Sequence, residues 1–168
     1  EACPYKKAMY RPNTRTTEKC IACYPRNDLD LGSRCVVGCV GKIRIQGWLH
    51  SPDKSDPENP MDYLVHEAKV ALPLYPQFGT EPNLYYIPPR WAPRDFLKQL
   101  FGPNVERALK RYSNPDAILY GLLRLFGTTE TIISRFNITD TEAIGYDRAD
   151  RELVRVALEE PMYVRPEY

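Results

Sequence analysis

The sequence predicts an α+β fold, and three features of the chain support this class. All five cysteines fall within the first 39 of 168 residues, as Cys3-Pro4 followed by Cys20-x2-Cys23-x11-Cys35-x3-Cys39. Farther along, apolar periodicity predicts two helices, and short alternating segments predict strands. The 16 prolines and 12 tyrosines indicate that extended, irregular segments connect these elements.

The first half of the chain offers few regular elements. Residues 1–27 are loop-rich and basic, and residues 33–40 are expected to form one short helical turn bearing Cys35 and Cys39. Alternating charge and isoleucine over residues 42–46 predicts a half-buried strand. Residues 51–60 are expected to form a solvated loop, and residues 63–70 a short helix.

The second half carries clearer boundary signals. An apolar-periodic helix is predicted to open at residues 93–95 and to run through Phe101, closed by Gly102. The tripeptide 114–116 predicts a second helix, with an asparagine N-cap, a proline at the first helical position and an aspartate at the positive end of the dipole. That helix is expected to end at Gly127. Residues 84–87 are expected to be extended, and residues 129–136 and 152–157 to be strands.

Charge and composition exclude several classes of protein. The 23 basic and 22 acidic side chains leave a formal charge of +1, so no basic excess points to a nucleic-acid partner. The apolar runs fall far short of the roughly 18 residues that a membrane span needs. The first residues show neither a targeting segment nor an initiator methionine. We therefore expect the chain to be a fragment of a larger polypeptide.

The clustered cysteines indicate a metal or iron–sulfur site. An odd number of cysteines cannot all be used in disulfides. The spacing alone leaves three alternatives: a structural zinc held by Cys20, Cys23, Cys35 and Cys39, an iron–sulfur cluster, or reduced or disulfide-bonded cysteines. Cys3-Pro4 matches the end of a ferredoxin run in which the last cysteine precedes a proline.

Basic side chains around the cysteines favour the iron–sulfur alternative. Four thiolates and an iron–sulfur cube form a net anion, and positive groups near the sulfurs raise its reduction potential. The simple alternative is that these charges form a solvated face. The candidates for tuning a cluster are Lys19, Arg26, Lys42 and Arg44, with Arg34 also nearby.

No arrangement of residues indicates catalysis on this chain. His50 and His66 are the only histidines, their spacing is not that of metal ligands, and surface or packing roles are expected for both. No glycine-rich nucleotide loop is present. The sequence therefore predicts no active site.

Six segments of the chain together resemble a known family: residues 3–7, 18–26, 35–44, 72–74, 86–89 and 107–111. The family they resemble is that of the iron–sulfur β subunits of respiratory molybdenum enzymes in the dimethyl-sulfoxide-reductase superfamily. That group includes nitrate reductase, nitrite oxidoreductase, ethylbenzene dehydrogenase, and selenate, chlorate and perchlorate reductases. The resemblance implies a partial ferredoxin-like module over residues 1–50 and an irregular, proline-rich, partly helical C-terminal extension over residues 51–168, which docks other subunits.

The resemblance also implies cofactors and ligands. Cys20, Cys23 and Cys35 would hold one [4Fe-4S] cluster together with an upstream cysteine. Cys39 would complete a second cluster and Cys3 a third, so every ligand set is completed by residues outside this chain.

The implied function is electron transfer in an anaerobic respiratory oxidoreductase complex. The implied partners are a molybdopterin-containing catalytic subunit and a haem-b subunit or other electron carrier. Membrane association would come through these partners, on either the periplasmic or the cytoplasmic side.

Overall fold

The computed structural model describes residues 8–159, and mixed helices and small antiparallel sheets confirm the α+β class. Two short strands open the described chain and a three-stranded sheet closes it, with helices between. In chain order the elements are β1 (Ala8–Arg11), β2 (Thr16–Lys19), α1 (Tyr24–Asn27), α2 (Arg34–Val37), the 3-10 helix η1 (Pro52–Lys54), α3 (Pro60–Asp62), the π-helix η2 (Tyr63–Glu67), β3 (Leu72–Pro73), the 3-10 helix η3 (Pro76–Phe78), β4 (Tyr85–Tyr86), α4 (Arg94–Phe101), α5 (Val105–Ser113), α6 (Ala117–Arg124), β5 (Arg135–Ile138), β6 (Glu142–Tyr146) and β7 (Glu152–Ala157).

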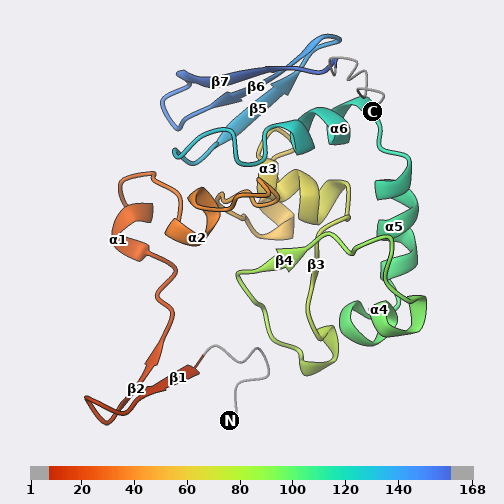
Figure 1. The fold of residues 1–168 in the computed structure, drawn as a ribbon. Coiled ribbons are helices and arrows are strands. Elements are labelled where there is room, and N and C mark those ends of the chain that lie inside the picture. Colours follow the sequence, from red (N-terminus) through yellow and green to blue (C-terminus); the bar gives the residue numbers. More distant parts are fainter. Residues whose placement is uncertain (1–7, 160–168) are drawn as a thin grey trace, which may run out of the picture.

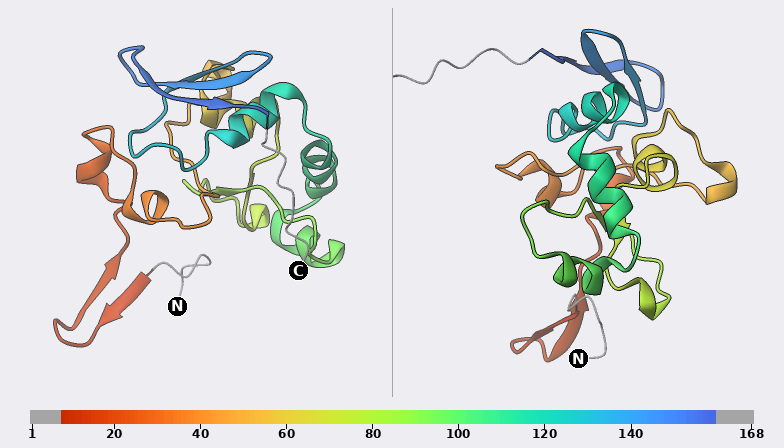
Figure 2. Two further views of the ribbon diagram at one scale, coloured as in Figure 1. Left: turned by 45° about the horizontal axis from the view of Figure 1, so that its top comes forward. Right: turned by 90° about the vertical axis from the view of Figure 1, so that its right-hand side faces the viewer.

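The largest sheet is antiparallel, in the order β5-β6-β7, and α6 lies directly beneath it in Figure 1. Helices α4 and α5 lie along one side, and the short pair β3–β4 lies near α3. The β1–β2 hairpin extends away from all of these elements. The views in Figure 2 agree that it projects from the rest of the chain.

Two hydrophobic clusters form the core, and both lie outside the cysteine-bearing segments. The first joins the α3–η2 region, α6 and the large sheet, and the second joins α4 and α5 to β3. Among the described residues, none before Ile45 contributes a side chain to either cluster. The buried members of the first are Tyr63, Leu64, Ala68, Val70, Ala71, Leu119, Leu122, Leu125, Ile133, Phe136 and Ala143, and those of the second are Leu72, Ala92, Leu97, Phe101, Val105, Ala108 and Leu109.

Gly121 allows α6 to approach the sheet closely. A Cβ atom at this position would lie 2.7 Å from Cδ1 and 2.8 Å from Cγ2 of Ile138. We expect Gly121→Ala to lower the free energy of unfolding by about 1 kcal/mol, because the overpacking cost of about 1–3 kcal/mol exceeds the gain in helix propensity of at most about 1 kcal/mol. Thermal unfolding measures this change.

A double variant provides the control for Gly121. Ile138→Val removes the Cδ1 atom that makes the closest contact. Adding it to Gly121→Ala should therefore recover part of the lost stability. An increase in stability from Gly121→Ala alone would contradict the close approach.

The prediction for residues 1–27 was wrong over the part that the structure describes. Residues 8–11 and 16–19 pair as an antiparallel hairpin, from Ala8 opposite Lys19 to Arg11 opposite Thr16. Every position of β1 is exposed. The hairpin therefore lacks the alternation of buried and exposed residues that reveals a strand in a sequence.

The strand predicted at residues 42–46 was also wrong. The segment pairs with no other strand, and Lys42 has a left-handed backbone with φ 48°. Ile45 packs against the first core cluster, whereas the Ile43 side chain is 74% exposed. The two isoleucines therefore do alternate between exposed and buried positions, but the segment forms no backbone hydrogen bonds of a sheet.

The helix predictions were more accurate. Helix α4 begins at Arg94, within the predicted opening at residues 93–95, and ends at Phe101 as predicted. Gly102 follows it with φ 73°. Helix α6 begins later than predicted, because Asp116 rather than Asn114 is the N-cap, and its carboxylate accepts the N–H of Leu119 at 2.8 Å. The helix ends at Arg124, three residues before Gly127.

The remaining predictions agree in part. The helix expected over 63–70 is present in part, as the π-helix η2 over residues 63–67, which continues directly from α3. Strand β7 has the predicted bounds. Strand β5 begins at Arg135, within the last residues of the strand expected over 129–136. Helix α5 and strand β6 were not predicted.

Candidate metal centre

The structure places four of the five candidate cysteines on short loops and single turns. Cys20 follows β2, Cys23 precedes α1, Cys35 is in α2, and Cys39 follows that helix. These four thiols are free of disulfides, and each is at least partly exposed. Cys3 lies outside the described residues. Within residues 8–159, no three or more His, Cys, Asp or Glu side chains converge as a metal site.

The loop between Cys20 and Cys23 has an unusual backbone. Ala22 and Cys23 are consecutive left-handed residues, with φ 55° and 54°. Such a conformation costs about 1–2 kcal/mol per non-glycine residue. It directs the backbone N–H of Ala22 toward the Sγ of Cys20, at 3.3 Å. Amide donors of this kind stabilise a thiolate, the form that binds metals.

The strain in this loop is testable. We expect Ala22→Gly to raise the free energy of unfolding by about 0.5–1 kcal/mol, because glycine adopts positive φ without steric cost. The unfolding temperature should rise by roughly 2 °C. Ala117→Gly, at the exposed first position of α6, should have the opposite sign. Equal destabilisation by both variants would contradict a strained Ala22.

Cys39 lies in a nest of backbone donors. The N–H of Ile43 makes the largest contribution in lowering the pKa of the Cys39 thiol. Loss of hydration opposes this shift, and weaker contributions from the N–H groups of Gly41 and Lys42 and from the guanidinium of Arg44 support it. The net pKa is below the usual value for cysteine. These amides were not predicted from the sequence, because their positions depend on the local backbone, in which Lys42 is left-handed with φ 48°.

The four basic candidates have different surroundings. Arg44 donates from Nη1 to the carbonyl of Cys35 at 2.8 Å and stabilises the Cys39 thiolate electrostatically. Lys42 contributes its backbone N–H to Cys39. Lys19 ends β2 with an exposed side chain. The Arg26 side chain donates from Nε to the carbonyl of Gly32 at 3.0 Å.

Backbone pairing attaches the cysteine-bearing segments to the C-terminal extension. Leu31 forms an isolated antiparallel bridge with Thr131. On either side of it, the N–H of Gly32 donates to the backbone carbonyl of Glu130 and the N–H of Ile132 donates to the backbone carbonyl of Asp30, both at 2.8 Å. The loop after α1 therefore has a fixed register against the segment that precedes β5.

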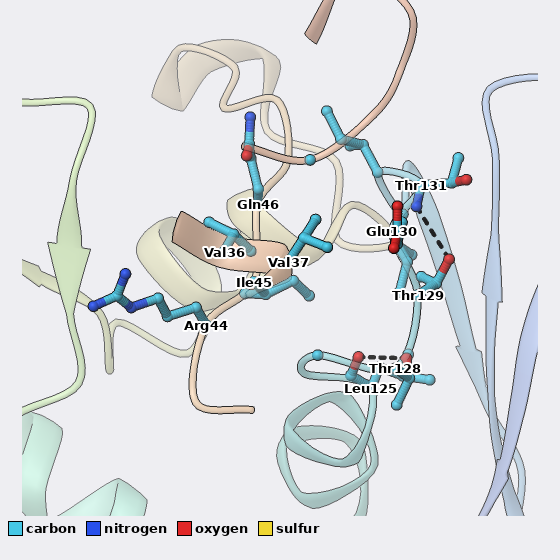
Figure 3. Close-up of a pocket in the computed structure, with 14 residues that line it drawn as sticks. Val36, Val37, Arg44, Ile45, Gln46, Leu125, Thr128, Thr129, Glu130 and Thr131 are labelled. Carbon is cyan, nitrogen blue, oxygen red and sulfur yellow. Dashed lines mark hydrogen bonds between the residues drawn. The ribbon is translucent and has the colours of Figure 1, made fainter. Parts of the chain in front are cut away.

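A cavity of about 150 Å³ lies beside this bridge. Figure 3 shows Val36 and Val37 of α2 on one part of its lining and the segment 128–131 on another. Arg44, Ile45 and Gln46 also line it. None of the four described cysteines lines this cavity, so these candidate ligands lie outside it.

The comparisons with known proteins decide between the alternatives for the cysteines. Residues 1–48, which contain all five, match the 4Fe-4S dicluster domain family. The dimethylsulfide dehydrogenase β subunit of Rhodovulum sulfidophilum is 40% identical over 124 residues, covering 65% of this chain and 37% of that protein. The selenate reductase β subunit of Thauera selenatis is 38% identical over 126 residues, with the same two coverages.

A further relative extends over more of the chain. The perchlorate reductase β subunit of Dechloromonas aromatica is 39% identical over 127 residues, covering 76% of this chain and 34% of that protein. The resemblance to the iron–sulfur β subunits is confirmed. The chain spans little more than a third of the length of these relatives. The match to a 4Fe-4S domain supports [4Fe-4S] clusters as the cofactors, and the zinc alternative is not supported.

The donor set present here fits that cofactor. Thiolates on short loops, with amide N–H groups directed at Cys20 and Cys39, are typical surroundings for iron–sulfur ligands. Within residues 8–159, no helix combines the length and the apolar character needed to cross a bilayer.

Proposed function

We propose that this chain transfers electrons through [4Fe-4S] clusters as part of a β subunit in a molybdenum oxidoreductase complex. The observation that carries this proposal is the match of residues 1–48, with every cysteine of the chain, to a 4Fe-4S dicluster domain. The names of the relatives, all β subunits of dehydrogenases or reductases, support it further.

In the proposed assignment, the cysteines belong to more than one cluster. Cys20, Cys23 and Cys35 bind one cluster with a ligand from outside residues 8–159, and Cys39 binds a second. One feature supports a separate cluster for Cys39: its thiol has its own nest of amide donors, the largest contribution coming from the N–H of Ile43. Cys3, which the structure does not describe, is proposed as a ligand of a third.

The chain's own residues supply ligands and charge. When bound, the clusters supply one-electron redox chemistry. Arg44 lies between two proposed ligands of different clusters, since it binds the Cys35 carbonyl and stabilises the Cys39 thiolate. We therefore assign it as the main cluster-tuning residue, with Lys42, Arg26 and Lys19 as weaker contributors. This chain itself performs no bond chemistry.

The positions of the two hydrophobic clusters support different roles for the two parts of the chain. Residues 1–50 form the cluster-binding part, and residues 51–168 form the extension that supports it and contacts other subunits. The absence of core residues before Ile45, within the described part, supports this division.

The proposed partners are a molybdopterin-containing catalytic subunit and a haem-b subunit or another electron carrier. The name of each relative as a β subunit supports a catalytic partner. The proposal of a haem-b subunit depends on the family resemblance alone.

Metal analysis of the intact complex, purified without oxygen, tests this function. Iron and acid-labile sulfide in equal amounts, together with EPR signals of reduced [4Fe-4S] clusters, are the expected result. A complex whose β subunit contains zinc at these cysteines, with no iron, would overturn the proposal.

A further inference from the structure

The two short helices beside the cysteines cannot define their own positions. Helices α1 and α2 have four residues each and no buried residue. Helices of this length are not stable without tertiary contacts. Their relative placement must therefore come from specific polar contacts with the better packed part of the chain.

Gln46 makes two of these contacts with one side chain. Its Nε2 donates to Oδ1 of Asn27, the last residue of α1, at 2.9 Å. Its Oε1 accepts the backbone N–H of Ser33, the N-cap residue of α2, at 2.7 Å. A single amide therefore joins the end of the first helix to the start of the second.

Both partners of Gln46 also bind the backbone carbonyl of Ala22, which lies between Cys20 and Cys23 in the sequence. Asn27 donates from Nδ2 to the carbonyl of Ala22 at 2.9 Å, and the Ser33 hydroxyl donates to that carbonyl at 2.8 Å. The N–H of Ala22 then donates to the Sγ of Cys20. Ser33 is only 5% exposed, so its part of the network is shielded from water.

Gln46 is itself held by the core. The preceding Ile45 packs against the first hydrophobic cluster. The following Gly47 lies against Met61 and the carbonyl of Ile133. Gln46 therefore links the core to the loop that carries Cys20 and Cys23 and to α2.

We propose that Gln46 is a positioning residue that fixes the Cys20–Cys23 loop against α2, so that Cys20, Cys23 and Cys35 are presented to one [4Fe-4S] cluster. The inference rests on the proposed function. Only an uncharged amide of this length both donates to Asn27 and accepts from Ser33. A glutamate keeps the acceptor but loses the donor. Asn27 must then rotate to donate to the new carboxylate, and it gives up its bond to Ala22.

The test compares Gln46→Ala with wild type in the intact complex. We expect the chelator concentration that removes half of the Cys20-dependent cluster to fall by about 10-fold or more, the range typical of lost outer-shell partners. The EPR spectrum of that cluster should shift, while signals that depend on Cys39 stay unchanged. Gln77→Ala, at an exposed position of η3, is the matched control.

If Gln46→Ala does not fold, Gln46→Glu tests whether Gln46 positions the cysteine ligands. It preserves the side-chain volume and the bond from Ser33, so we expect a smaller change in the same direction. Chelator resistance and spectrum equal to those of Gln77→Ala would overturn the inference.

Comparing Cys20→Ser with wild type separates a failure of the proposed function from a failure of the positioning role. If no cluster signal depends on Cys20, the proposed function fails. A Cys20-dependent cluster that is insensitive to Gln46 removes only the positioning role.

Discussion

Cys20→Ser is expected to remove the EPR signal of one [4Fe-4S] cluster from the intact complex and to slow its electron transfer by at least about 100-fold. Loss of an outer-shell partner already costs about 10- to 100-fold, and a direct ligand should cost more. Serine keeps the size of the side chain but provides no soft thiolate for iron. The measurements are iron content, EPR of the reduced complex and turnover with an artificial electron donor.

Cys39→Ser is the matched comparison for this experiment. Cys39 has separate amide donors and is assigned to a different cluster. We therefore expect it to remove a second signal and to leave the Cys20-dependent one in place. If the two variants abolish the same signal, the four described cysteines share one site and the assignment to separate clusters is wrong.

The cysteines show what spacing in a sequence can and cannot predict. Their concentration before residue 40 predicted a metal or iron–sulfur site, but the spacing alone left a structural zinc open. The nearby basic side chains and the family resemblance, and not the spacing, favoured iron–sulfur clusters. Spacing could not predict what surrounds each sulfur. The donors at Cys39 come from local backbone, whereas the Cys20 loop depends on Gln46, which lies 19 residues beyond Asn27 in the sequence.

Helices α4 and α5 show the same limit for secondary structure. Helix α4 was predicted because an apolar stripe begins after Pro93 and ends at Gly102, where positive φ closes the helix. Helix α5 has a weaker start, since the side chain of its N-cap residue Asn104 makes no capping hydrogen bond. The helix is formed mainly because Val105 and Leu109 are buried against α4, and only tertiary structure reveals that contact.

The strand predicted at residues 42–46 failed for a related reason. A strand needs a neighbour with free backbone groups, and none of the strands within residues 8–159 pairs with it. The alternation instead reflects Ile45 on the core, followed by Gln46, whose side chain binds the cysteine segments. A period of two in a sequence therefore does not distinguish a strand from a single extended linker.

Asp62 is a buried carboxylate that attaches the loop over residues 50–56 to α3. The residue is fully buried, and its carboxylate accepts the N–H of His50 at 2.8 Å, the His50 Nδ1 at 2.6 Å and the N–H of Asp56 at 3.0 Å. His66 adds a contact from its Nε2 to the His50 carbonyl at 2.9 Å. Both histidines thus have structural contacts, and the loop over residues 50–56 is held by one carboxylate.

Asp62→Asn is expected to lower the free energy of unfolding by about 2–3 kcal/mol at neutral pH. Hydrogen bonds to a charged group contribute about 1.5–3 kcal/mol, and the amide that replaces one oxygen cannot accept from these donors. The unfolding temperature should fall by roughly 5–10 °C. Asp140→Asn, an exposed carboxylate, should change stability by less than about 0.5 kcal/mol.

The pH dependence of this difference provides the sharper test. Burial raises the pKa of Asp62, but the donors from Asp56 and His50 outweigh it, so the net pKa lies below the usual value. The stabilisation is therefore complete above the unfolded-state pKa of about 4 and is lost as the pH falls through the lower pKa of the folded state. We expect wild type and Asp62→Asn to differ most at neutral pH and to converge in acid. A difference that grows as the pH falls below about 4 would show that the folded protein holds Asp62 as the neutral acid.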